Sequence, residues 1–287
     1  MRLEDLNTYA EVTWCPGCSN FLIDRAIKEA LIELSEEQKI DLNKVVVLSG
    51  IGCHAKISDY INLCSFYSLH GRVPSVASGI KLANPELVVI GFAGDGDAYA
   101  EGLDHLIFAA KRNSDITMII HNNRVFALTT GQFTPTSPVG FRGRSTPMGA
   151  PEEPFNPILL MLASGATFVA RCFAGNLGHM KEVFKRALLH RGFAFIDVLQ
   201  PCLSFYDLFD FYREHVYELE SVDHDPSDFS RAIEVAREWN YEGEDDARIA
   251  IGIFYETRKP TYEELVLKGR KIEGGVPPIE ELLEEKK

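Results

Sequence analysis

Residues 87–97 read LVVIGFAGDGD, an apolar run that passes directly into a turn of glycine and aspartate. Its first part, Leu87–Ile90, has the length and the continuous apolar character of a buried strand. Residues 99–111 then carry apolar side chains at helical spacing, and Ile116–Ile120 is another short apolar run. This order predicts two parallel strands joined by a helix, with Gly94–Asp97 at the end of the first strand.

The same alternation continues on both sides of this stretch. We predict strands at 45–48, 168–170 and 193–199, and helices at 20–34, 157–164 and 177–189. This pattern predicts an α/β fold, a doubly wound and mostly parallel sheet with helices on both faces.

The sequence between and beyond these elements also suggests how the chain is organised. Residues 132–157 are rich in Pro, Thr, Ser and Gly and predict a long loop with a functional role. We expect one domain at 1–222. Residues 223–287 are charged and interrupted by Pro and Gly, and we expect a C-terminal helix and an extended arm that is peripheral or contacts a partner.

Composition excludes several classes of protein. The 287 residues carry a net charge of −13, whereas a nucleic-acid surface needs a basic face. No apolar run has the roughly 18 residues of a membrane helix, and the acidic start lacks the apolar core of a signal peptide. Six cysteines are too few for a disulfide scaffold. We therefore expect a cytoplasmic enzyme that binds neither nucleic acid nor membrane.

Polar side chains follow two neighbouring predicted strands. Asp95 comes after the first strand and Asn123 after the second. Because ligands bind at the carboxyl ends of strands in open α/β sheets, we expect both side chains at one edge. Oxygen ligands suit Mg²⁺, which usually keeps phosphate oxygens in its shell. Gly94 and Gly96 allow a close approach to the ligand, and a helix from about Ala98 would direct its amino terminus at the phosphates.

Four cysteines lie in a tight turn or after predicted strands: Cys15, Cys18, Cys53 and Cys202. Their segments are expected to converge on the same edge of the sheet. Four thiolates bind either a [4Fe–4S] cluster or a tetrahedral Zn²⁺, and spacing does not choose between them. The neighbouring diphosphate site favours the cluster. We expect the remaining two cysteines, Cys64 and Cys172, to be buried apolar residues.

The glycine–aspartate turn with a following Asn-Asn resembles the thiamine diphosphate motif of thiamine-dependent enzymes. With the cysteines, the chain resembles the beta subunit of 2-oxoacid:ferredoxin oxidoreductases from about Thr13 to Phe209. The motifs that carry this resemblance are WCPGC at 14–18, SGIGC at 49–53, HGR at 70–72, GIKLANP at 79–85, GDGD at 94–97, NN at 122–123, LTTGQ at 128–132, TPT at 134–136 and PC at 201–202. The resemblance implies the diphosphate-binding domain of the thiamine diphosphate-binding fold.

The resemblance also implies roles for individual residues. Mg²⁺ would be bound by the side chains of Asp95 and Asn123 and by the backbone carbonyl of Val125, while Asp97 would bind the metal through water or hold the loop. The cluster ligands would be Cys15, Cys18, Cys53 and Cys202. The expected cofactor-binding residues are Gly50, Ile51, Gly52, Cys53, Gly94, Asp95, Gly96, Asp97, Asn123, Val125, Leu128 and Thr129. The expected catalytic residues are His70, Arg72 and Thr130.

The implied activity is oxidative decarboxylation of a 2-oxoacid to acyl-CoA and CO₂, with electrons passing through the cluster to ferredoxin. The carboxylate that activates thiamine diphosphate is not apparent in this chain. We expect an alpha subunit, or alpha and gamma subunits, to supply the pyrimidine-binding domain and a catalytic Glu. Ferredoxin could be reached through a ferredoxin-like delta subunit. The Cys-Pro-Gly-Cys form and the modest length favour the 2-oxoglutarate type.

The chain departs from the usual family pattern at Ser19 and Thr130, and Phe126-Ala127 replaces a common Tyr-Gly. The last two departures flank the expected substrate pocket and leave the preferred 2-oxoacid open. His54 is expected either to donate a hydrogen bond to cluster sulfur or to lie at the surface. Two alternatives remain: a thiamine-dependent decarboxylase or synthase without electron transfer, and a zinc-stapled, non-catalytic α/β protein.

Overall fold

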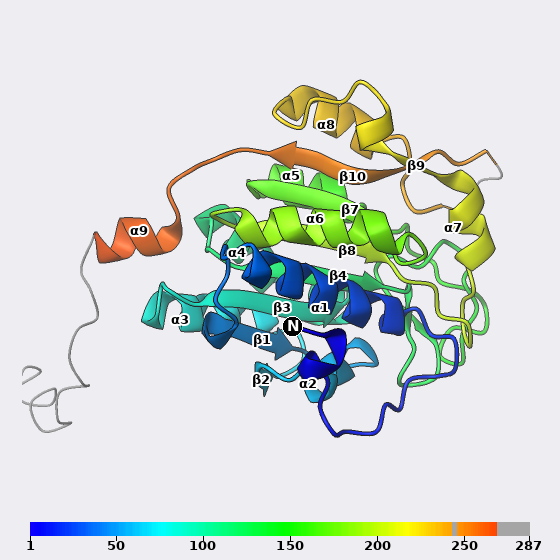
Figure 1. The fold of residues 1–287 in the computed structure, drawn as a ribbon. Helices are drawn as coiled ribbons and strands as arrows, with labels where there is room; N and C mark the ends of the chain where they lie inside the picture. The colour runs from blue at the N-terminus through cyan, green and yellow to red at the C-terminus, as the bar shows by residue number, and fades with distance from the viewer. Residues whose placement is uncertain (243–245, 269–287) are drawn as a thin grey trace, which may run out of the picture.

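The computed structural model describes residues 1–242 and 246–268, and its main feature is an eight-stranded sheet (Figure 1). The strand order is β2-β1-β3-β4-β8-β7-β10-β9. The strands of this sheet are β1 (Val45–Ser49), β2 (Cys64–Tyr67), β3 (Val88–Gly94), β4 (Thr117–Asn122), β7 (Phe168–Phe173), β8 (Ala194–Leu199), β9 (Val216–Glu218) and β10 (Ile249–Glu256). A separate short hairpin pairs β5 (Val125–Phe126) with β6 (Gln132–Phe133).

The α-helices connect or flank these strands, and they are α1 (Asn20–Glu36), α2 (Ile57–Tyr60), α3 (Val73–Ala83), α4 (Leu103–Arg112), α5 (Pro157–Ala163), α6 (Leu177–Leu189), α7 (Phe209–His215), α8 (Phe229–Ala236) and α9 (Tyr262–Leu267). Short 3₁₀ segments are η1 (Leu3–Leu6), η2 (Leu42–Lys44), η3 (His54–Lys56) and η5 (Leu219–Ser221). The helix predicted at 99–111 begins earlier and has two parts, the π-helical turn η4 (Gly96–Glu101) and then α4.

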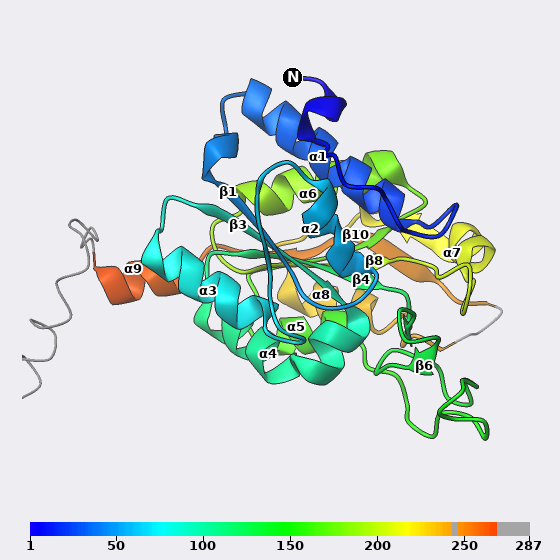
Figure 2. The same cartoon turned by 90° about the horizontal axis from the view of Figure 1, so that it is seen from below.

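Helices cover both faces of the sheet, which confirms the predicted doubly wound architecture. Helices α1 and α6 lie together on one face, and α3, α4, α5 and α8 lie on the other (Figure 2). The first six strands in the sheet order, β2-β1-β3-β4-β8-β7, run parallel to one another, and β10 is antiparallel to β7. Strands β1, β4 and β8 are buried at every position, as expected for strands covered on both faces.

The C-terminal part differs from the expectation of a peripheral helix and arm. Strand β10 lies inside the main sheet between β7 and β9, and its first six residues are buried. Trp239, Tyr241 and Ile249 belong to a third apolar cluster with Phe173. Dense charge in the surrounding sequence hid this strand. The expected arm also includes 243–245 and 269–287, which lie outside the described residues.

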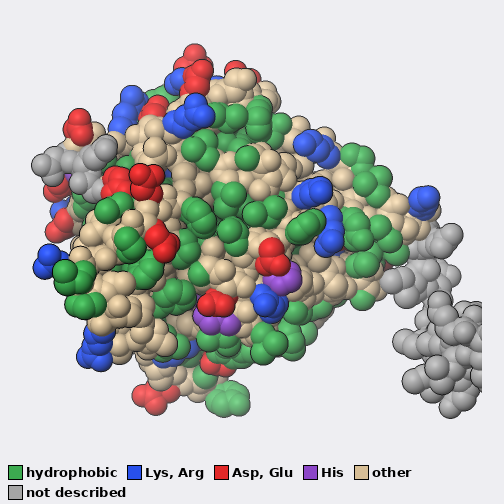
Figure 3. Space-filling model, turned by 180° about the vertical axis from the view of Figure 1, so that it is seen from behind, with side chains coloured by type: hydrophobic (Ala, Val, Ile, Leu, Met, Phe, Trp, Pro, Cys, Tyr) green, Lys and Arg blue, Asp and Glu red, His purple; other side chains and the backbone are tan. Residues whose placement is uncertain are grey.

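Surface charge and the hydropathy of the helices are relevant to two of the classes that composition excludes. On the face seen in Figure 3, acidic and basic side chains are interspersed among hydrophobic ones. Within residues 1–242 and 246–268, no helix has the length and apolar character needed to cross a membrane.

The topology brings the predicted site segments together. Cys53 follows β1, Asp95 follows β3, Asn123 follows β4 and Cys202 follows β8. These four strands are consecutive neighbours in the sheet and run parallel. Their carboxyl ends therefore form one continuous edge, where ligands of open α/β sheets bind.

Candidate active site

A cavity of about 110 Å³ lies at this edge and contains the predicted metal ligands. Asp95, Asn123 and Val125 all line it, so the three expected oxygen donors border one space. The Oδ1 of Asn123 accepts a hydrogen bond from the backbone N–H of Val125 at 3.1 Å. This local bond sets the turn that brings both residues to the cavity.

The Asp95 carboxylate is almost completely buried, at 1% exposure. Burial raises the pKa of Asp95 to about 6, and the hydroxyl groups of Thr134 and Thr136 partly offset that rise. Among the described residues, no lysine, arginine or histidine forms an ion pair with this carboxylate. A buried anion without a cationic partner is costly, and a bound metal cation would compensate it.

Asp97 has a different role from Asp95. Its Oδ1 lies 2.5 Å from Nδ1 of His70 and accepts the Gly71 backbone N–H at 2.6 Å. Nε2 of His54 lies 3.3 Å from Oδ2 of Asp97. Burial acts to raise the pKa of Asp97, but the two histidines outweigh it and hold the pKa at about 2. Asp97 is thus an ionised carboxylate that orients His70, which itself lines the cavity.

Two glycines at this edge are required by close packing inside the protein. A Cβ atom at Gly50 would lie 1.7 Å from Oδ2 of Asp97, and one at Gly96 would lie 2.2 Å from the Phe126 ring. For Gly96 the expected reason was close approach to the ligand. The structure shows that these positions exclude larger side chains before any ligand is present.

The four predicted cysteines line a second cavity of about 250 Å³. Burial raises the pKa of the Cys18 thiol to about 11, and nearby Cys202, Cys53 and Cys15 add to the rise. The segments predicted to converge therefore do converge. Among the residues that the structure describes, no three His, Cys, Asp or Glu side chains are gathered closely enough to hold a single metal ion.

Hydrogen bonds attach the Cys-Pro-Gly-Cys turn to the strand ends on both sides. The Trp14 indole N–H donates to the carbonyl of Cys53 at 2.7 Å. The Ser19 hydroxyl donates to the carbonyl of Pro201 at 3.1 Å. Ser19 is a departure from the usual family pattern, and this bond gives it a role, because it joins the segments of Cys18 and Cys202.

The two cavities share part of their walls. Cys53, Asn123, Ala127 and Leu128 line both of them. The space that contains the metal-binding oxygens is thus directly adjacent to the space that contains the four thiols. Such adjacency is what electron transfer between two bound groups would require.

Comparison with known proteins agrees with this geometry. Residues 50–198 match the thiamine pyrophosphate enzyme C-terminal TPP binding domain, and residues 202–270 match the C-terminal part of the pyruvate ferredoxin oxidoreductase beta subunit. The chain is 42% identical over 264 residues to 2-oxoacid:ferredoxin oxidoreductase 1, subunit beta, of Aeropyrum pernix, covering 88% of this chain and 80% of the relative. This chain belongs to the family of 2-oxoacid:ferredoxin oxidoreductase beta subunits.

Further relatives support the same family. A 2-oxoacid:ferredoxin oxidoreductase subunit beta of Saccharolobus solfataricus is 41% identical, with 94% of this chain and 90% of the relative covered. A solved 2-oxoglutarate:ferredoxin oxidoreductase of Magnetococcus marinus, with 2-oxoglutarate, coenzyme A and succinyl-CoA bound, matches with a TM-score of 0.88 at 35% identity, covering 100% of this chain and 96% of that chain. The predicted family, fold and enzyme class are confirmed, and neither alternative class is favoured.

Most of the other predicted site residues of this beta subunit lie at the two cavities, but not all. The diphosphate cavity is the 110 Å³ cavity that contains Asp95 and Asn123. It is also lined by Ile51, Gly52, Gly94, Gly96, Leu128 and Thr129. Thr130 lines the cysteine cavity instead and has a left-handed backbone with φ of 78°. Arg72 lines neither cavity; its guanidinium donates to the Glu101 carbonyl at 2.8 Å. This placement indicates that Arg72 fixes the end of η4.

One of the two alternatives for His54 was wrong, and so was the expected burial of Cys64. His54 is 5% exposed and faces Asp97, so it is not a surface histidine. Cys64 is exposed on the edge strand β2, whereas Cys172 is buried as expected. Strand β2 pairs with β1 only, and an edge position gives its side chains less cover than a central one.

Sequence reasoning missed several polar residues around the cavities. The Gln200 amide N–H lies 3.9 Å from Sγ of Cys18, and the Ser204 hydroxyl lies 3.8 Å from Sγ of Cys15. His121 is buried, and its Nδ1 lies 2.8 Å from Oδ1 of Asn20, which lines the cysteine cavity. Gln200 and Ser204 lie two positions before and after Cys202, and that proximity in sequence was the available signal.

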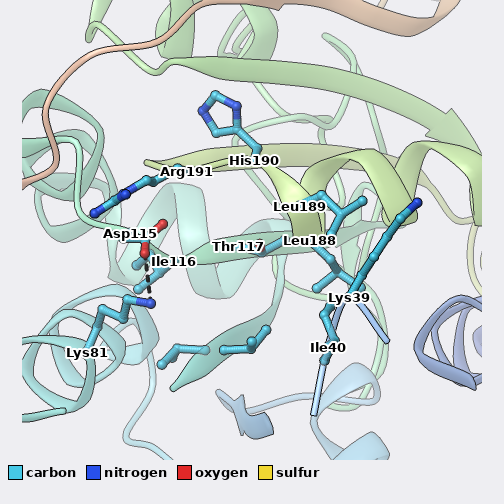
Figure 4. Close-up of a pocket in the computed structure, with 12 residues that line it drawn as sticks. Lys39, Ile40, Lys81, Asp115, Ile116, Thr117, Leu188, Leu189, His190 and Arg191 are labelled. Carbon is cyan, nitrogen blue, oxygen red and sulfur yellow. Dashed lines mark ion pairs between the residues drawn. The ribbon is translucent and has the colours of Figure 1, made fainter. Parts of the chain in front are cut away.

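A third cavity, of about 250 Å³, lies at the opposite edge of the sheet (Figure 4). It lies where β3 and β4 begin and includes Lys81, His190 and Arg191. Lys81 is ion-paired with Asp115 at 2.7 Å, and the two side chains point toward each other in Figure 4. None of the predicted site residues lies there.

Proposed function

We propose that this chain is the thiamine diphosphate-binding subunit that oxidatively decarboxylates a 2-oxoacid to acyl-CoA and CO₂ and passes the electrons to ferredoxin through a [4Fe–4S] cluster. The observation that carries the proposal is the shared wall between the diphosphate cavity and the cysteine cavity. A decarboxylase or synthase without electron transfer would have no use for four thiols at that position.

Mg²⁺ would be held by the side chains of Asp95 and Asn123 and by the Val125 carbonyl. The fit rests on the donor set, because these oxygens border one cavity and Asp95 is a buried carboxylate without a cationic partner among the described residues. Hard oxygen donors of this kind suit Mg²⁺ together with a diphosphate. When bound, thiamine diphosphate supplies the chemistry that cleaves the bond between the carboxylate and the 2-oxo carbon.

The cluster would be held by Cys15, Cys18, Cys53 and Cys202. Support comes from the convergence of the four thiols on one cavity and from the nearby donors of Gln200 and Ser204. Hydrogen bonds to cluster sulfurs are a usual way to tune iron–sulfur potentials. Purification without oxygen separates this proposal from the zinc alternative, because a cluster is brown and zinc is colourless.

His70 is the best candidate for a residue that handles protons in the diphosphate cavity. Asp97 fixes its ring through Nδ1, and the hydrogen bond to Asp97 raises the pKa of His70. The other ring nitrogen, Nε2, would then be available to hold a proton in the cavity that His70 lines. An oriented pair of this kind is the usual arrangement for general acid–base catalysis.

A partner subunit would complete the site. No glutamate is among the described residues that line the diphosphate cavity, and its two aspartates already have the roles given above. The activating carboxylate would therefore come from an alpha subunit, or alpha and gamma subunits. Five exposed apolar residues line or adjoin the two cavities and support such a contact: Ile51, Leu69, Leu128, Leu203 and Phe205.

Ferredoxin, directly or through a ferredoxin-like delta subunit, and coenzyme A would be the other partners. Among substrates we favour 2-oxoglutarate, the ligand of the solved relative. A cytoplasmic location agrees with six unpaired cysteines.

The test is an anaerobic assay of viologen reduction with pyruvate, 2-oxoglutarate and branched-chain 2-oxoacids. The complete complex is expected to be active and the chain alone, reconstituted with iron and thiamine diphosphate, inactive. Comparable turnover by the chain alone would place the activating carboxylate in this chain. No turnover by the complex with any 2-oxoacid would contradict the proposed activity.

A further inference from the structure

The first residues of the long loop at 132–157 lie inside the protein. Thr134, Thr136 and Ser137 are buried, with exposures of 2%, 0% and 2%. Composition predicted a long functional loop here, and a loop at the surface would leave these hydroxyls in water. Their burial next to Asp95 requires another explanation.

The Thr136 hydroxyl lies between the two metal-binding segments. Its Oγ1 is 2.8 Å from Oδ2 of Asp95 and 2.9 Å from Oδ1 of Asn122, the neighbour of Asn123. A hydroxyl has one proton and can donate to only one of these acceptors at a time. The ionised carboxylate is the stronger acceptor, because charge-assisted hydrogen bonds are roughly twice as strong as neutral ones.

Asn122, the second acceptor near the Thr136 hydroxyl, is held in place by a separate hydrogen bond. The Asn122 side-chain N–H donates to Oδ1 of Asp197 at 3.0 Å. Asp197 is completely buried and also accepts hydrogen bonds from Tyr99 at 2.8 Å and Tyr241 at 2.6 Å. Asn122 thus cannot turn to release Thr136 without breaking a buried network that includes the C-terminal segment.

The backbone around Thr136 is held as well. The Arg124 Nε donates to the Thr136 carbonyl at 2.6 Å, and the Ser137 hydroxyl donates to the Arg124 carbonyl at 2.6 Å. Arg124 directly follows Asn123, so these bonds attach the buried part of the loop to the predicted metal-binding turn. The Thr136 hydroxyl therefore has little freedom to move away from Asp95.

We propose that Thr136 is a positioning residue for the metal site, whose hydroxyl fixes the orientation of the Asp95 carboxylate relative to the Asn122-Asn123 turn. This inference rests on the proposed function, because it concerns the Mg²⁺ that Asp95 and Asn123 would hold. It adds a residue that does not itself bind the metal. Groups that orient metal ligands typically change metal affinity by about 10–100-fold when they are removed.

The experiment measures Mn²⁺ affinity, as a probe for Mg²⁺, in the purified complex at saturating thiamine diphosphate. Free Mn²⁺ is counted by its electron paramagnetic resonance signal. Thr136→Val keeps the shape and removes the hydroxyl, and it is expected to weaken Mn²⁺ binding by about tenfold or more. Thr136→Ser keeps the hydroxyl and is expected to restore most of the affinity.

Thr117→Val is the matched control. Thr117 is a buried threonine at the start of the same strand as Asn122, and its hydroxyl bonds to the Ala187 carbonyl at 3.4 Å. This variant should bind Mn²⁺ like the unaltered complex. If Thr136→Val does not assemble, Thr136→Ala and Thr136→Ser are compared instead, since this pair also differs by the hydroxyl.

Asp95→Ala separates failure of this inference from failure of the proposed function. Loss of Mn²⁺ binding in Asp95→Ala together with unchanged affinity in Thr136→Val would overturn the role of Thr136 and leave the metal site intact. Unchanged affinity in Asp95→Ala would overturn the metal site itself. Equal losses of affinity in Thr136→Val and Thr136→Ser would show that the site depends on the whole threonine side chain, and would overturn a role for the hydroxyl alone.

Discussion

The diphosphate cavity and the cysteine cavity adjoin each other, but the protein holds their ligands in place to different degrees. Asp95 and Asp97 are 1% and 2% exposed and are hydrogen-bonded from several elements. Cys15 is exposed, and the other three predicted cluster ligands are partly exposed. The fold thus preorganises the carboxylates of the diphosphate cavity. The thiols have fewer partners and would gain order from the bound cluster, as metal sites coupled to folding do.

Removing a cysteine should abolish cluster binding in the cysteine cavity and leave thiamine diphosphate binding in the diphosphate cavity unchanged. Cys202→Ala and Cys18→Ala are expected to abolish iron retention and ferredoxin reduction, because each removes a thiolate that no other described side chain replaces. Iron content and thiamine diphosphate content are measured on the anaerobically purified complex. Thiamine diphosphate should remain bound.

The matched controls are Cys64→Ala and Cys172→Ala, since neither residue lines the cysteine cavity. Both should retain iron. Full iron content in Cys202→Ala would remove that residue from the ligand set.

Removing the buried carboxylate should have the opposite selectivity. Asp95→Ala is expected to weaken thiamine diphosphate and Mg²⁺ binding by well over tenfold, about 1.4 kcal/mol or more, because an anionic ligand is lost. Binding is measured by equilibrium dialysis of the complex. Iron should stay at the unaltered level, and a simultaneous loss of iron would show that the two cavities are not independent.

A charge on the apolar rim should affect assembly more than either cavity. Leu69 is 77% exposed beside His70, and Leu69→Asp would place a charge in an interface expected to exclude water. The dissociation constant for the partner subunit is expected to rise about tenfold or more. Leu265→Asp on α9, at a position 58% exposed, is the control and should assemble normally. Equal affinities of both variants for the partner subunit would show that Leu69 lies outside the interface.

The buried charge of Asp95 also predicts a dependence of stability on pH. The folded-state pKa of about 6 lies above the usual value of 3.8, so the ionised carboxylate destabilises the metal-free fold at neutral pH. Asp95→Asn is expected to stabilise the metal-free complex by about 1–3 kcal/mol at pH 7. This gain is full above pH 6 and disappears as the pH falls toward 4, when the carboxylate takes up a proton. Thermal unfolding at several pH values measures it, and a gain that does not vary with pH would refute the cause.

The smallest effect concerns the cluster environment. Gln200→Leu removes the amide N–H near Sγ of Cys18 and should make the cluster potential more negative without loss of iron. Redox titration followed by electron paramagnetic resonance measures the shift. Ser227→Ala, at an exposed hydroxyl bonded to Asp225, is the control and should leave the potential unchanged. An unchanged potential in Gln200→Leu would show that the long contact between the amide N–H and Sγ of Cys18 does not influence the cluster potential.

The sequence by itself was sufficient to predict the five central strands of the sheet and the convergence of the candidate site residues on one edge. Apolar runs such as Val45–Leu48 and Leu87–Ile90 are long and uninterrupted, and buried parallel strands need that pattern. Because Asp95, Asn123, Cys53 and Cys202 each follow a strand, parallel topology alone brings them to one edge. Local pattern and global fold agree here, so the prediction needed no knowledge of packing.

Only the tertiary structure decided the roles of residues whose partners are distant in the sequence. Asp97 lies 27 positions from His70, and Asp197 lies 75 from Asn122. The hydrophobic periodicity of the sequence gives no information about such distant pairs. Strand β10 was hidden in a charged segment, and its place in the sheet comes from pairing with β7. Thr136 looked like a loop residue because composition indicates a loop but not its burial, which depends on what packs over it.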